Sequence, residues 1–151
     1  LKNEESAAFM INEVAYWGNE KEKAKLNEFF LSPKLLCRKA ALNAVSLLRD
    51  EKQEQMAVDL YDQQPESIRQ EILRVVRAIN SGRHTQFLVR AFRTATSKTT
   101  REIALTSLYA YGEEGRSTFE LLRHDLNENE KDRKLMAQID AVDILNQMRT
   151  L

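Results

Sequence analysis

The chain of 151 residues is 42% hydrophobic and 30% charged, which indicates a soluble globular protein with a core of its own. It has only 4 Gly and 2 Pro, a single Cys and no apolar run near the ~18 residues of a membrane helix, so an all-helical chain is favoured, and an internal disulfide and a membrane span are excluded. The charges of its 23 basic and 23 acidic side chains cancel. We expect a single cytoplasmic domain over residues 1–151. Because the sequence begins with Leu1, we expect it to be part of a longer chain.

Five apolar segments follow one another along the chain at an almost constant distance. Their central residues stand 31, 31, 32 and 31 positions apart. Each segment is also apolar one position before its central residue and three, five and six positions after it. These spacings fall on one face of a helix, which predicts five helices in register. We call them B helices and their central residues anchors; the anchors are Ile11, Leu42, Leu73, Leu105 and Met136.

Second amphipathic segments, which we call A segments, lie between the B helices. The chain therefore alternates a helix, a short turn and a further helix. The nine helices predicted in chain order cover residues 5–17, 20–31, 34–49, 52–63, 66–80, 83–95, 99–111, 115–126 and 130–149.

The starts and ends of the B helices carry recognisable signals. Pro33 and Pro65 stand where two of them begin, and proline in a first turn loses no hydrogen bond. Thr99 with a glutamate three residues later has the spacing of a capping box at the start of a third. Gly18 and Gly112 each stand seven positions after an anchor, where a helix end favours a residue with positive φ.

A repeat of two helices buries its apolar faces only by stacking on neighbouring repeats. A compact bundle is the alternative, although a bundle does not require the same residue types in the same register. The chain resembles a HEAT-repeat, or armadillo-like, α-solenoid with the short repeats of bacterial HEAT-like and phycocyanobilin-lyase-like proteins. The resemblance implies an all-α, right-handed α-α superhelix of one half repeat, residues 5–17, and four helix-pair repeats. It implies a habit of binding partners and transfers no catalytic residue.

Residues that could perform chemistry are few. His84 and His124 are not spaced with other ligands for a metal site, so we expect solvated histidines at helix ends. Cys37 has no histidine near it in sequence to act as a base, and we expect a buried thiol. We therefore expect that the chain is not an enzyme and that it has no catalytic residue, metal site or cofactor.

The polar side of the B helices is the predicted binding surface. Positions one and four after each anchor are expected to point away from the A segments, along the concave side of the stack. They are polar early in the chain, basic in the middle and mixed late. We call this surface the B-helix face; its candidate partner-binding residues are Asn43, Ser46, Arg74, Arg77, Thr106, Tyr109 and Asp140.

The neutral total hides a basic belt over residues 69–101. Residues 66–101 hold 8 basic and 2 acidic side chains, whereas residues 1–65 hold 9 and 11 and residues 102–151 hold 6 and 10. Two belt arginines, Arg90 and Arg93, lie in an A segment, so we expect the belt to be divided between faces. The belt comprises Arg69, Arg74, Arg77, Arg83, Arg90, Arg93, Lys98 and Arg101.

Three functions are compatible with this surface. The first is a non-enzymatic scaffold or adaptor that binds another protein, or the rest of its own longer chain, through the B-helix face. The second is a binder of nucleic acid or another polyanion through the basic belt, which the zero net charge disfavours. The third is a lyase-like enzyme, by fold analogy alone. We favour the first.

The first B helix has no A segment before it. Its residues include Phe9, Met10, Tyr16 and Trp17, more apolar surface than the polar outer face of a terminal repeat. We therefore expect a preceding A helix or self-association through this half repeat.

Overall fold

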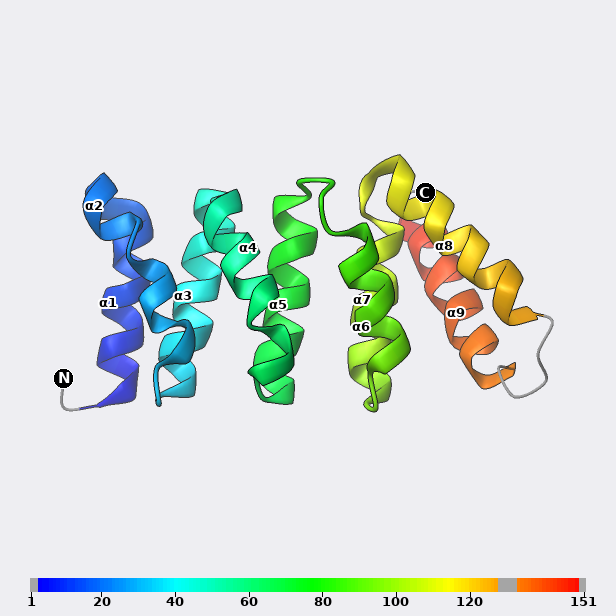
Figure 1. Ribbon diagram of the computed structural model, residues 1–151, viewed down its shortest axis with the longest axis horizontal. Helices are drawn as coiled ribbons and strands as arrows, with labels where there is room; N and C mark the ends of the chain where they lie inside the picture. Colours follow the sequence, from blue (N-terminus) through cyan, green and yellow to red (C-terminus); the bar gives the residue numbers. More distant parts are fainter. Residues whose placement is uncertain (1–2, 128–132, 150–151) are drawn as a thin grey trace. The chain divides into compact units, whose positions relative to one another are not determined.

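A computed structural model describes the backbone of residues 3–127 and 133–149 and the side chains of residues 3–124 and 137–149. The chain is all-helical, with no strand in these described ranges (Figure 1), as the apolar spacing predicts. It divides into two compact units, residues 1–81 and residues 82–151.

The first unit places three B helices side by side (Figure 1, blue to green). α1 packs against α3, and α3 packs against α5. The A segments cover them, since the 3-10 helix η1 packs on α3 and α4 packs on both η1 and α5. The elements are α1 Glu4–Trp17, α2 Glu20–Lys23, η1 Leu26–Leu31, α3 Leu35–Leu48, α4 Glu51–Asp59, the 3-10 helix η2 Tyr61–Gln63 and α5 Glu66–Ile79.

The second unit holds two helix pairs. α7 contacts α6, α8 and α9, and α8 also contacts α9, so α7 lies at the centre of this unit. The elements are α6 Thr85–Thr94, α7 Lys98–Tyr109, α8 Gly112–Asn127 and α9 Arg133–Arg149.

Two predicted helices are interrupted. The segment predicted as 52–63 ends as α4 and continues as η2, and the segment predicted as 20–31 breaks between α2 and η1. At the second break, the buried Gln53 side chain enters the backbone ladder: its amide nitrogen donates to the Lys23 carbonyl at 3.0 Å and its oxygen accepts from the Asn27 N–H at 2.7 Å. Lys23 and Asn27 would be partners in a continuous α-helix, so an inserted side chain explains the break.

The residues predicted to end or cap the helices agree with the structure only in part. The prediction of positive φ seven positions after an anchor is confirmed for Gly112, with φ 65°, and wrong for Gly18, with φ −70°. Two non-glycine residues in the same register, Arg49 and Asn80, adopt the left-handed conformation at the ends of α3 and α5. Ser97, and not Thr99, caps α7. Its side chain accepts a hydrogen bond from the Thr100 N–H.

The core follows the predicted register with one exchange of positions. Anchors and the residues three positions later are buried from α3 onward wherever their side chains are described. The positions five after each anchor, predicted as core, are exposed: Tyr16, Leu47, Ala78, Ala110 and Ala141. The positions two after the anchors are buried instead: Ala44, Val75, Ser107 and Gln138. The anchor Met136 lies outside the described side chains.

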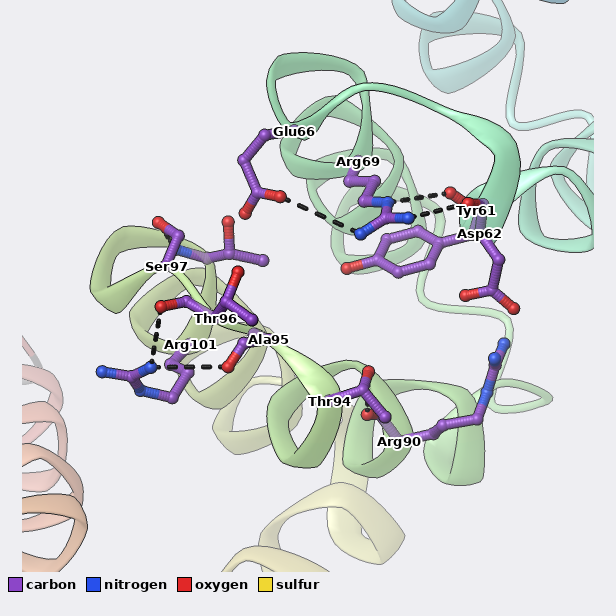
Figure 2. Close-up of polar contacts among 11 residues, drawn as sticks. Tyr61, Asp62, Glu66, Arg69, Arg90, Thr94, Ala95, Thr96, Ser97 and Arg101 are labelled. Carbon is purple, nitrogen blue, oxygen red and sulfur yellow. Dashed lines mark hydrogen bonds and ion pairs between the residues drawn. The ribbon is translucent and has the colours of Figure 1, made fainter.

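An arginine of the basic belt, Arg69, braces the turn that precedes its own helix. It is the fourth residue of α5, and it donates to the Tyr61 carbonyl at 3.2 Å and to the Asp62 carbonyl at 2.7 Å (Figure 2). Its guanidinium also lies 5.5 Å from the centre of the Tyr61 ring and 4.0 Å from the Glu66 carboxylate. The Arg69 side chain therefore ties η2 to the start of α5.

The same contact recurs at the fourth residue of α3 and of α7. Arg38 donates to the Ser32 carbonyl at 2.6 Å. Arg101 donates to the carbonyls of Ala95 and Thr96, both at 3.4 Å (Figure 2). We call this recurring contact the arginine brace. A buried glutamine completes it in two cases, since Gln64 accepts from Arg38 at 2.8 Å and Gln138 accepts from Arg101 at 3.5 Å.

Gly115 fixes how closely α8 approaches the end of α7. A Cβ atom at this position would collide with the Leu108 carbonyl oxygen and with the Tyr111 side chain. We therefore expect Gly115→Ala to lower the free energy of unfolding by about 2 kcal/mol, because backbone atoms must move to admit the methyl group. Chemical denaturation checks this, with Ser117→Ala, at an exposed position of the same helix, as the control. Equal stability of the two variants would contradict the close approach.

Candidate partner-binding surface

The candidate residues of the first unit form a polar stripe across α3 and α5. Asn43, Arg74 and Arg77 are exposed and Ser46 is half-buried. The Asn43 amide donates to the Asn12 side chain of α1 at 3.4 Å, which links the stripe across neighbouring B helices. Arg74 is paired with Glu71 on its own helix at 2.8 Å, so part of its charge is already balanced.

Tyr109, predicted on the polar side of its helix, is buried with 7% of its surface exposed. Its ring packs edge to face on Phe119 of α8 at 5.1 Å, and the Arg116 guanidinium lies 3.4 Å from its centre. Burial raises the pKa of its hydroxyl, against the opposing charge of Arg116, and a hydrogen bond with Asp143 raises it further. Tyr109 therefore belongs to the contact between α7 and α8, and its prediction as an exposed binding residue is wrong.

Asp140 belongs to a cluster of charges between α8 and α9. Arg123 of α8 reaches Asp140 at 2.6 Å and Asp143 at 2.7 Å, with Glu120 at 3.9 Å. The hydrogen bond with Asp143 raises the pKa of Arg123 most, and the neighbouring acids add to it. The ion pairs of this cluster link α8 to α9 and engage the Asp140 carboxylate. The hydrophobic pattern of the sequence does not predict the cluster.

Thr106 lines a groove between α7 and α9. The groove has a volume of about 680 Å³, within the range of binding sites for ligands and peptide segments. Its floor is mostly apolar, and Leu145 keeps 54% of its surface exposed there. The uncharged lining residues, which we call the floor, are Thr106, Ala137, Gln138, Ala141, Val142 and Leu145.

The rim of this groove is predominantly basic. Three cations, Lys98, Arg101 and Arg149, surround it with one acid, Glu102. Lys98 and Glu102 form a solvent-exposed pair at 3.9 Å, and Arg101 is held by the arginine brace. The sequence pattern identified Thr106 but not the groove, because Ala141 and Val142 of α9 were assigned to the core.

Several residues of the basic belt are held in local contacts. Its arginines Arg69 and Arg101 donate to backbone carbonyls of their own repeats, and Lys98 is paired with Glu102. Arg90 and Arg93 lie on α6, an A segment, as predicted. The belt also spans the division between the units at residues 81 and 82. Several of the charged side chains in the belt thus make hydrogen bonds or ion pairs within their own repeats.

Groups that could perform catalysis are scattered. Cys37 is buried, as predicted. His124 is exposed, but His84 is buried at the start of α6 beside Phe87, so the prediction of a solvated His84 is wrong. Among residues 3–124 and 137–149, no group of three or more His, Cys, Asp or Glu side chains is placed to hold a metal ion. None of the helices in the described ranges combines the length and apolar character needed to cross a membrane.

Comparison of the chain with protein-family models, with curated proteins and with solved structures gives no match.

Proposed function

We propose that the chain is a HEAT-like α-solenoid module of the cytoplasm that binds another protein through its B-helix face. The five-fold register of anchors and the alternation of A segments and B helices support the right-handed solenoid. The groove between α7 and α9 is the observation that carries the binding function, because it combines an apolar floor with a basic rim.

The partner segment that fits this groove is acidic with apolar anchors. Apolar side chains of the partner would cover Leu145 and the neighbouring alanines, while carboxylates would meet Lys98 and Arg149. An amphipathic helix laid between two helices is a common way to fill such a groove. Opposite charges at the rim add specificity and speed of association more than affinity.

Peptide binding tests the proposal. We expect a capped amphipathic peptide of about 16 residues built from Glu and Leu to bind, and the matching peptide of Lys and Leu to leave the groove empty. Lys98→Glu combined with Arg149→Glu should weaken the acidic peptide at least about tenfold by fluorescence anisotropy. The control is Lys52→Glu combined with Arg93→Glu, which reverses two exposed charges outside the groove.

Salt dependence separates a protein partner from a nucleic acid. Duplex DNA that neutralises several phosphates would bind with a log–log salt slope near −0.9 for each phosphate contact. We expect a shallow slope for the acidic peptide and only non-specific binding of duplex DNA. Tight, salt-steep DNA binding, or an acidic peptide that ignores the groove variant, would contradict the proposed function.

A further inference from the structure

The face of α1 that points away from α3 carries large apolar side chains in solvent. Met10 is 56% exposed and Trp17 is 82% exposed, and Phe9 and Tyr16 are exposed to a similar degree. Ile11, on the opposite side of the helix, is buried. The exposed side chains recur at helical spacing, so they form one continuous stripe.

The register identifies what this stripe lacks. Met10 stands one position before its anchor, and the equivalent residues Ala41, Ile72 and Ala104 are at most 1% exposed. Trp17 stands six positions after its anchor, and the equivalent residues are half-buried in α3, buried in α5 and α9, and buried just beyond the end of α7. The later B helices therefore bury the two positions that α1 leaves open.

The cover on the neighbouring B helix shows the shape that fits. η1 packs on α3 and contributes Leu26 and Phe30, four residues apart and each 1% exposed. In an α-helix, two apolar side chains at this spacing lie on one face. An amphipathic helix with such a pair matches the requirement of the α1 stripe.

The charge on α1 defines the chemistry of its partner. α1 contains Glu4, Glu5 and Glu13 and no basic residue. Glu4 accepts from the Leu36 backbone at 2.8 Å and belongs to the contact with α3. Glu13 stands four residues after Phe9 and four before Trp17, so it lies within the stripe. A helix that covers the stripe must place a cation against Glu13, because a carboxylate loses its hydration there. Two copies of α1 paired with one another would bring acids together instead.

We propose that the exposed face of α1 binds a basic amphipathic helix of another protein, in the position that an A segment occupies on the later B helices. The proposal extends the proposed function to a second surface, and it requires only that α1 folds as described. Apolar residues of the partner helix cover Met10 and Trp17, and a lysine or arginine pairs with Glu13.

Trp17 is the only tryptophan in the chain and reports on this surface directly. We expect the capped Lys and Leu peptide to shift the Trp17 emission to the blue with saturation, and the Glu and Leu peptide to produce no shift. Glu13→Lys should weaken the basic peptide at least about tenfold and allow the acidic peptide to bind, since the cation requirement is reversed. Glu28→Lys, at an exposed position of η1, is the matched control and should change neither. Met10→Ala should also weaken the basic peptide, without loss of stability, because its side chain is exposed.

The two surfaces are distinguishable. Lys98→Glu with Arg149→Glu should leave the Trp17 shift intact, and Glu13→Lys should leave the groove's affinity for the acidic peptide intact. Absence of any Trp17 shift, or equal shifts with both peptides, would overturn the proposal for α1 alone. A blue shift that rises with protein concentration, with a dimer in sedimentation velocity, would assign the stripe to a second copy. Shielding of Trp17 in the monomeric chain without peptide would assign the stripe to a segment of the chain itself. Either result would also overturn the proposal.

Discussion

Replacing Val76 with aspartate is expected to lower the free energy of unfolding by at least about 3 kcal/mol, because it places a carboxylate at a fully buried position of the core. Val76 stands three positions after the anchor Leu73, and both side chains are 0% exposed. Urea denaturation followed by circular dichroism measures the change.

Ala78→Asp is the matched control for this substitution. Ala78 stands two residues later in α5, at the position five after the anchor, and is exposed. Asp has a lower helix propensity than Ala and is unfavourable near a helix C-terminus, so the control should cost about 1 kcal/mol. Similar losses for the two variants would show that the buried face of α5 is assigned incorrectly.

Replacing Arg69 with methionine is expected to lower the free energy of unfolding by about 2–3 kcal/mol. Hydrogen bonds from a charged group to the Tyr61 and Asp62 carbonyls supply most of this, and the contact with the Tyr61 ring supplies less. The exposed pair with Glu66 adds little. Thermal and chemical denaturation provide the measurement.

Two further variants separate the brace from simple loss of charge. Arg69→Lys keeps the charge but lacks the planar fork that reaches both carbonyls, so most of the loss should remain. Arg74→Met removes a guanidinium whose pair with Glu71 is largely exposed, and it should cost less than about 0.5 kcal/mol. Full recovery by lysine, or an equal effect at Arg74, would refute the arginine brace.

The helices could be predicted because the anchors repeat. Leu42, Leu73 and Leu105 are all buried, and the spacing between them needs no knowledge of neighbours. The exchange of core positions had a physical reason. The buried positions three and six after the anchor lie about 300° and 240° around the helix from it. Position two, at about 200°, borders this face, whereas position five, at about 140°, lies outside it. Ser107 and Gln138 are polar at position two, which hid the true edge of that face.

The candidate surface was harder to predict because it depends on polar side chains in contact between repeats. Gln53 carries no apolar signal, and yet it is buried and bonds to the backbone of α2 and η1. Arg69 was counted as belt charge, although its hydrogen bonds face its own repeat. Tyr109 ends α7, and α8 folds over it through Phe119. A helical pattern describes one helix at a time and contains no term for the neighbour that covers it.

The arginine brace also bears on the order in which the chain folds during synthesis. Each brace joins residues only a few positions apart, from Arg38 to Ser32 and from Arg101 to Ala95 and Thr96. Contacts of such low sequence separation close with little loss of chain entropy and form early. A turn between an A segment and its B helix can thus be fixed before the ribosome has made the following repeat, while the glutamines that reach across repeats close later.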